Sequence, residues 1–260
     1  MRVGLCLPQF RDDAEPAVAT ARAAEAAGLD GVFVFDHLWP LGRPDRPALY
    51  CNVLLGALAA ETERLVLGPL VARVSVLPDA VLVNAMVTLQ RMVGERLLVT
   101  LGTGDSANRD ENEAYGLEFA PVADRVESLV RCCADLRAKG VATWVGGNSA
   151  VVRRAAAASD GWNLWGVDAA RFATEVAAVA PLASSWGGLV LVGRTEAEAR
   201  QKLARHGDRP GLVHGTVADL GRHLAALAAT GATWAVCAPI DLGSDPAVVE
   251  YVAEAAASAR

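Results

Sequence analysis

Short apolar runs alternate with longer, Ala-rich stretches along the whole 260-residue chain. The short runs are rich in aliphatic and β-branched residues and contain few polar positions, which is typical of parallel strands covered on both faces. We predict eight such strands, at Val3–Leu7, Gly31–Phe35, Leu65–Leu70, Arg96–Gly102, Thr143–Gly146, Gly161–Leu164, Leu189–Val192 and Thr233–Ala238. The stretches between them have helical character, so strands and helices alternate from end to end, as in a parallel α/β sheet.

Two of the predicted helices begin at recognisable capping residues. Asp79 is expected to cap the helix that leads to Met92, because a side-chain oxygen at a helix start accepts hydrogen bonds from free backbone N–H groups. Thr216, followed by Asp219, has the spacing of a loose capping box. We therefore expect helices that begin near residues 79 and 216.

Eight strand–helix units favour a closed (β/α)₈ TIM barrel, since an open doubly wound sheet usually has fewer strands. The alternative is a Rossmann-type half followed by a second small domain. No linker rich in Pro, Gly or Ser divides the chain, and the alternation continues through its middle. We therefore expect residues 1–260 to form a single TIM-barrel domain.

Composition and charge exclude several classes of function. Hydrophobic residues make up 53% of the chain and charged residues 21%, which suits a large buried core. The net charge is −6 and no basic stripe is interleaved with aromatic residues, so nucleic acid is not an expected partner. No apolar window is long enough for a membrane span, and the segment Met1–Cys6 lacks a signal-peptide layout. A cytoplasmic protein is expected.

The cysteines and histidines do not predict a metal site or a disulfide framework. The chain has five cysteines, an odd number, and none are spaced as C-x-x-C. Its four histidines form no H-E-x-x-H motif. We expect no metal cofactor.

Polar residues directly after the predicted strands are the candidates for chemistry, because the active site of such a barrel lies at the C-terminal ends of its strands. Asp36 and His37 follow the second strand, where a carboxylate beside an imidazole can supply acid–base chemistry near neutral pH. The alternative is that Asp36 caps a turn and His37 is an ordinary hydrogen-bonded polar residue.

Two glycine-containing turns follow the fourth and fifth strands. Gly102–Asn108 allows the backbone to approach a planar or phosphorylated ligand closely, although glycines also simply turn a chain out of a barrel. It lacks the third glycine of a dinucleotide fingerprint. Gly146–Ser149 precedes a predicted helix, whose N-terminus suits phosphate, although Asn148 and Ser149 could equally be plain N-caps.

Together these segments resemble the luciferase-like monooxygenase superfamily, and within it the coenzyme F420-dependent oxidoreductases. The resemblance implies a bacterial luciferase-like barrel that binds a flavin or a deazaflavin. It is carried by Ala24–His37 (AEAAGLDGVFVFDH), Leu67–Pro78 (LGPLVARVSVLP), Gly94–Asp105 (GERLLVTLGTGD), Trp144–Ser149 (WVGGNS) with Asp160–Trp162 (DGW), and Gly215–Gly231.

The resemblance also implies roles for individual residues. His37 would be the catalytic base or the group that polarises the substrate, Asp105 a proton donor, and Asp36 a contact of the deazaflavin ring. The peptide between Leu70 and Val71 matches the place where relatives hold a non-proline cis bond beside the ring. The remaining cofactor contacts would be Gly104, Ala107 and Asn108, with Gly146 and Gly147 holding the phosphate.

The chain departs from these relatives where they carry a lid. They usually carry a long insertion that covers the active site between the fourth helix and the fifth strand, whereas here Leu136–Gly140 leads almost directly into Val141–Val145. We expect a shortened member that lacks this lid near residues 137–142.

Three functions are compatible with the resemblance. The first is a coenzyme F420-dependent oxidoreductase that transfers a hydride between the deazaflavin and a small organic substrate. The second is an FMN-dependent monooxygenase with a partner flavin reductase, and the third is a non-catalytic flavin-binding protein. Relatives commonly form homodimers through their second and third helices, here about Ala48–Glu61 and Asp79–Met92.

Overall fold

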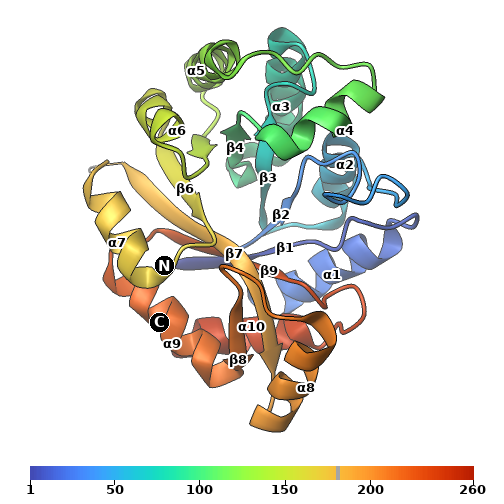
Figure 1. The fold of residues 1–260 in the computed structure, drawn as a ribbon, viewed down its shortest axis with the longest axis vertical. Helices are drawn as coiled ribbons and strands as arrows, with labels where there is room; N and C mark the ends of the chain where they lie inside the picture. Colours follow the sequence, from blue (N-terminus) through green and yellow to red (C-terminus); the bar gives the residue numbers. More distant parts are fainter. Residues whose placement is uncertain (180–181) are drawn as a thin grey trace.

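A computed structural model describes residues 1–179 and 182–260 (Figure 1). In these residues a parallel sheet closes on itself, because β1 pairs with β9 and β7 pairs with both β6 and β9. The ring consists of β1 (Arg2–Cys6), β2 (Gly31–Val34), β3 (Val66–Arg73), β4 (Val99–Gly102), β5 (Thr143–Gly146), β6 (Gly161–Trp165), β7 (Ala183–Gly193) and β9 (Trp234–Pro239). Every predicted strand overlaps one strand of the ring, so the predicted (β/α)₈ TIM barrel is confirmed.

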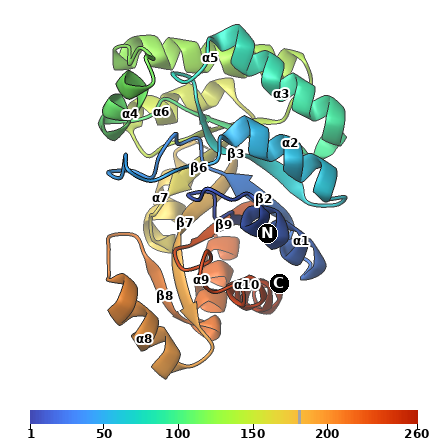
Figure 2. The same cartoon turned by 90° about the vertical axis from the view of Figure 1, so that its right-hand side faces the viewer.

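One further strand in the described residues, β8 (Val213–Thr216), was not predicted and lies outside the ring. It pairs with the last part of β7, Val190–Gly193. Within that part, residues 191–193 lie beyond the pairing of β7 with β6 and β9. β8 and helix α8 lie at one edge of the molecule in both views (Figures 1 and 2). The four residues of β8 are partly exposed, so they lack the apolar run by which the other strands are recognised.

Helices cover the outside of the barrel. The α-helices are α1 (Glu15–Ala26), α2 (Cys51–Glu61), α3 (Asp79–Val93), α4 (Arg109–Ala114), α5 (Val122–Ala138), α6 (Ala150–Ala155), α7 (Ala169–Ala177), α8 (Glu196–His206), α9 (Val217–Ala229) and α10 (Val248–Ser258), with 3₁₀ turns η1 (Gly94–Arg96), η2 (Ser106–Asn108) and η3 (Ala156–Ala158). Among residues 1–179 and 182–260, no helix combines the length and the apolar character needed to cross a bilayer.

The two capping predictions have different outcomes. The capping box is confirmed, because Thr216 Oγ1 accepts the N–H of Asp219 (3.3 Å) and Asp219 Oδ2 accepts the N–H of Thr216 (2.8 Å). The Asp79 prediction is wrong, since Asp79 is the first residue of α3 and makes no capping bond. Its carboxylate instead accepts hydrogen bonds from Ser128 and Arg131 of α5 and joins the two helices.

Apolar side chains alternate between the inside of the barrel and the layer under the helices. Phe33, Trp144 and Trp234 belong to the inner group, while Val32 and Val34, on either side of Phe33, pack in the outer layer. The Phe33 and Trp234 rings meet edge to face at 5.5 Å. These large rings fill the barrel interior, so open space remains at the C-terminal ends of the strands.

Candidate active site

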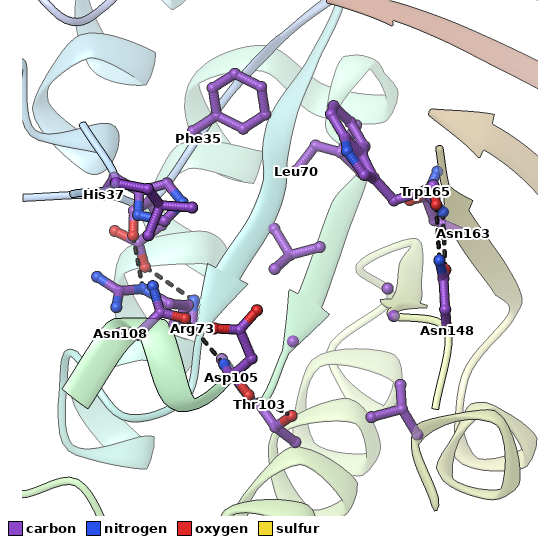
Figure 3. A pocket seen from close by; sticks show the side chains of 18 of the residues that line it. Phe35, His37, Leu70, Arg73, Thr103, Asp105, Asn108, Asn148, Asn163 and Trp165 are labelled. Carbon is purple, nitrogen blue, oxygen red and sulfur yellow. Dashed lines mark hydrogen bonds between the residues drawn. The ribbon is translucent and has the colours of Figure 1, made fainter. Parts of the chain in front are cut away.

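A cavity of about 750 Å³ opens at the C-terminal ends of the strands (Figure 3). We call it the mouth cavity. Its lining includes every predicted site residue except Ala107, which is exposed in the turn beside it. These predicted lining residues are Asp36, His37, Leu70, Val71, Gly104, Asp105, Asn108, Gly146 and Gly147. Pockets of several hundred Å³ commonly hold cofactors or substrates.

His37 follows β2 and is held by a carboxylate that the sequence did not reveal. Its Nδ1 lies 3.2 Å from Oε2 of Glu111 on α4, and the imidazole is 19% exposed. Burial opposes ionisation of Glu111, but its hydrogen bond with His37 and the positive charge of Arg73 leave its pKa below the ordinary 4.5. An ionised carboxylate only accepts, so in the neutral form of the imidazole Nδ1 carries the proton and Nε2 is left as the basic nitrogen.

Arg73 anchors this carboxylate from the end of β3. Its Nη2 donates to Glu111 Oε1 (3.0 Å) and its Nη1 donates to Asn112 Oδ1 (3.1 Å). Glu111 is fully buried and Arg73 is 3% exposed, so this ion pair is screened little by water. Leu38 N–H also donates to Glu111 Oε1. Glu111, which orients His37, is therefore itself held by Arg73 on β3 and by the backbone next to His37.

One carboxylate oxygen of Asp36 is hydrogen-bonded to the end of β3. Its Oδ2 accepts the N–H of Arg73 (2.8 Å), and Arg73 Nε donates to the backbone oxygen of Asp36 (2.7 Å). Burial raises the pKa of Asp36, although the N–H and the charge of Arg73 oppose that shift. Asp36 is thus a buried wall residue of the cavity that also fixes the β2–β3 contact.

The turn after β4 is held by its own side chains. Asp105 Oδ1 accepts the N–H of Ala107 (2.9 Å), and Asn108 Oδ1 accepts the N–H of Asp105 (2.9 Å). Asn108 Nδ2 also donates to Glu111 Oε2 (3.3 Å), which links the turn to the carboxylate behind His37. Figure 3 shows His37, Arg73 and Asn108 on one side of the cavity, facing Asn148, Asn163 and Trp165 on the other.

The opposite wall is formed by backbone after β5. A Cβ atom at Gly146 would lie 2.4 Å from the Val71 side chain, so only glycine allows this approach. The Leu70–Val71 peptide beside it is cis, which confirms the bond that the resemblance implied. A wall of backbone and aliphatic side chains, with no polar side chain from Gly146 or Val71, suits the face of a planar ring.

The glycine turn before α6 offers fewer donors than the sequence suggested. Gly147 adopts a φ of +137°, and its N–H already donates to the Asn163 backbone oxygen (3.1 Å). The Asn148 side chain is bound to the Trp165 backbone in both directions (2.7 and 2.9 Å), and Ser149 Oγ caps α6. The Val152 N–H is used by that cap, so the free donors for an anion at this place are the backbone N–H groups of Ala150 and Val151.

Aromatic side chains form the remaining wall. The Phe10 and Phe35 rings stack in parallel with centroids 6.1 Å apart, and Trp165 meets Phe35 edge on at 5.7 Å. The His37 ring lies 6.4 Å from Phe35. His37 therefore stands at the border between this apolar wall and the polar Glu111–Arg73 pair.

Sequence reasoning missed Glu111, Arg73 and Asn163. Glu111 lies in a polar stretch (RDENEA) in which no local feature separates it from its acidic neighbours. Arg73 and Asn163 did carry a signal, because each is a polar residue inside or at the end of an otherwise apolar strand. Such residues are rarely buried without a partner.

A family model described as luciferase-like monooxygenase matches residues 1–146. The chain is 37% identical over 89 residues to an F420-dependent glucose-6-phosphate dehydrogenase of Nakamurella multipartita, covering 34% of this chain and 26% of that protein. It is 33% identical over 107 residues to a protein of the same name from Microbacterium testaceum, covering 41% and 31%. The matched region is thus no more than about a third of either relative.

Solved structures resemble the chain over almost its full length. An F420-dependent secondary alcohol dehydrogenase in complex with an F420–acetone adduct superposes with a TM-score of 0.80 at 12% identity, covering 100% of this chain and 99% of that one. An EDTA monooxygenase from Chelativorans sp. BNC1 has a TM-score of 0.80 at 13% identity, covering 100% and 93%. At these identities the likeness shows the fold alone.

Proposed function

The chain belongs to the luciferase-like monooxygenase family, and on that premise we propose that it is a coenzyme F420-dependent oxidoreductase acting on a small organic molecule. The observation that carries the proposal is the His37–Glu111 pair, which presents a basic ring nitrogen at the mouth cavity. The relatives named above as F420-dependent support the choice of cofactor.

The residues present fit a flat ring with an anionic tail. The cis Leu70–Val71 peptide and Gly146 would support the ring, and the first turn of α6 would hold the phosphate. When bound, the deazaflavin supplies a hydride donor or acceptor. We assign no bond from Gly147 to the phosphate, because its N–H is already used; its part is to keep the space beside α6 open.

The chain's own residues supply the proton chemistry. A substrate alcohol loses a proton from oxygen when it is oxidised, and Nε2 of His37 would accept that proton while Glu111 holds Nδ1–H and stabilises the resulting imidazolium. In the reverse direction His37 would return the proton. Asp105, which has one carboxylate oxygen outside its capping bond, would be a second proton donor at the cavity edge.

Two alternatives remain as proposals of lower rank. The first is an FMN-dependent monooxygenase that works with a partner flavin reductase. The fold is compatible with it, because a solved EDTA monooxygenase has the same fold. The connection from α5 to β5 is confined to residues 139–142, so no lid extends over the mouth from there, which would expose a reduced flavin to water. A non-catalytic flavin-binding protein would not need an imidazole oriented by a buried carboxylate, as His37 is by Glu111.

Titration with each cofactor tests the proposal. We expect quenching of F420 fluorescence with a Kd in the micromolar range and weaker binding of FMN. The variant Gly147→Asp should weaken F420 binding at least about tenfold, because a carboxylate would face the phosphate. Gly147→Ala, which has the same backbone strain without the charge, is the matched control.

Each result has a defined meaning. Tighter binding of FMN than of F420 would favour the monooxygenase alternative. Equal affinities of the Asp and Ala variants would place the phosphate elsewhere. Binding of neither cofactor below about millimolar, only about −4 kcal/mol, would overturn the cofactor proposal.

We further propose that the protein is a cytoplasmic homodimer formed through α2 and α3. Val53 on α2 and Val81 and Met92 on α3 are 72%, 49% and 56% exposed, which leaves apolar side chains on this face. All five cysteines are buried and unpaired, as is usual in a reducing compartment.

The dimer proposal predicts that Val53→Asp converts a dimer into a monomer in light scattering coupled to gel filtration. The charge would have to be buried without a partner in the interface. Val151→Asp on α6, at 38% exposure, is the control and should not change the mass. A monomeric wild-type protein would contradict the prediction.

A further inference from the structure

A second cavity, of about 860 Å³, adjoins the mouth cavity. The two share Phe10, Phe35, Leu189 and Arg209 in their linings, so a molecule at the mouth can extend from one into the other. Three arginines line the second cavity: Arg11, Arg46 and Arg209. We call it the arginine cavity.

In residues 1–179 and 182–260, no carboxylate lies within ion-pair distance of any of these three arginines. Other basic residues nearby do form ion pairs: Arg43 with Asp45, and Lys202 with Asp241 and Asp245. Each of the three arginines instead donates to a backbone oxygen. Arg11 Nη1 donates to Gly243 (2.6 Å), Arg46 Nη2 donates to Phe10 (3.4 Å), and Arg209 Nη2 donates to His206 (2.7 Å). A carbonyl orients a guanidinium group but does not neutralise its charge, and four of the five N–H donors remain.

Three of the nearby carboxylates have other partners. Lys202 on α8 forms ion pairs with Asp241 (2.8 Å) and Asp245 (2.7 Å), which tie α8 to the β9–α10 connection containing Gly243. Asp13, which also lines the cavity, accepts the N–H of Glu15 at the start of α1 (2.9 Å). Asp12 is the other acidic lining residue, so arginines outnumber aspartates.

We propose that the arginine cavity binds an anionic group of the substrate, a carboxylate or a phosphate, while the reacting carbon lies in the mouth cavity beside His37. The inference deepens the proposed function, on which it rests. Arginine suits this role because its planar guanidinium presents paired donors to carboxylate and phosphate oxygens. Arg209, which lines both cavities, would be the contact nearest the reacting centre.

Calorimetric titration with inorganic phosphate and, separately, with malonate at low ionic strength tests the inference. We expect one of these anions to bind, and Arg11→Gln and Arg46→Gln each to weaken its binding about tenfold, as loss of a charge-assisted hydrogen bond does. Arg43→Gln is the matched control, since Arg43 is in the same loop as Arg46 but is paired with Asp45. It should leave the affinity unchanged.

The anion with the higher affinity identifies the group, phosphate or carboxylate. Arg46 is exposed, so Arg46→Gln keeps the test valid even where Arg11→Gln disturbs the contact with Gly243. Anion binding that is lost in Gly147→Asp but kept in the arginine variants takes place at the start of α6. If neither Arg11→Gln nor Arg46→Gln weakens the binding of phosphate or malonate, or if neither anion binds, the inference is overturned. The titration needs no cofactor, so failure of F420 to bind is a separate result.

Discussion

Replacement of His37 by alanine is expected to lower turnover by ~10²–10⁴-fold, the range contributed by a positioned general acid or base. The variant lacks the imidazole that Glu111, itself paired with Arg73, holds at the cavity. F420 affinity should stay within a few-fold, because the ring would rest on the opposite wall, at the cis Leu70–Val71 peptide and Gly146. The measurement is the rate of F420 absorbance change with the substrate found by a screen of small alcohols and carbonyl compounds.

His214→Ala is the matched control for this prediction. His214 lies exposed on β8, outside the linings of both cavities, so the same deletion there should leave turnover unchanged. If His37→Ala and His214→Ala have equal turnover, His37 has no part in the mechanism, and the non-catalytic alternative gains support.

Replacement of Glu111 by leucine is expected to lower the free energy of unfolding by about 3–5 kcal/mol, the usual cost of leaving one partner of a buried ion pair alone. Arg73, at 3% exposure, would keep its charge without the carboxylate, and the Leu38 N–H would lose its acceptor. Urea denaturation measures the change. Glu113→Leu on the same helix, where the exposed pair with Arg109 contributes little, should cost no more than about 1 kcal/mol.

The same pair predicts a pH dependence with a definite sign. The folded-state pKa of Glu111 lies below its ordinary value of 4.5, so folding favours the ionised form. The stabilisation is fully present above pH 4.5 and is lost as the pH falls through the lower, folded-state pKa. The difference in stability between wild type and Glu111→Gln should therefore shrink only in that acidic range. A difference that stayed constant down to pH 2 would show that the charge of Glu111 does not matter.

Kinetics of Glu111→Gln separate a role of Glu111 in positioning His37 from a purely structural role. Glu111→Gln keeps an acceptor near His37 but no negative charge, so it should lower kcat more than it raises KM for the substrate. A purely structural role for Glu111 would instead reduce the amount of folded protein and leave kcat per folded molecule unchanged.

The barrel could be predicted because its signals are local. An apolar run such as Gly31–Phe35 must be covered on both faces, and its length and alternation with helices predict parallel strands without knowledge of any contact. The same holds for the site residues directly after the strands, since a barrel brings the C-terminal ends of all its strands to one rim. Asp36, His37, Gly104, Asp105 and Gly146 could therefore be assigned to one cavity.

The partners of those residues could not be predicted in this way. Glu111 reaches His37 across 74 positions of sequence and Arg73 across 38, and nothing in the segment RDENEA distinguishes the buried carboxylate from the exposed ones. Which acidic side chain turns inward depends on how η2 and α4 pack over the rim. β8 is a similar case. It is a strand because it pairs with the end of β7, and its own sequence lacks the apolar run by which a strand can be predicted.

The chain's local pattern thus specified the strands, the rim and the side chains on it. The closure of the barrel and the packing of α4 decided which nitrogen of His37 is free and which charges are buried together. The packing of the loops around Arg11, Arg46 and Arg209 likewise decided which charges are left without a partner. The physical reason is that hydrophobic periodicity acts between near neighbours in sequence, whereas ion pairing and desolvation depend on distances that only the folded chain sets.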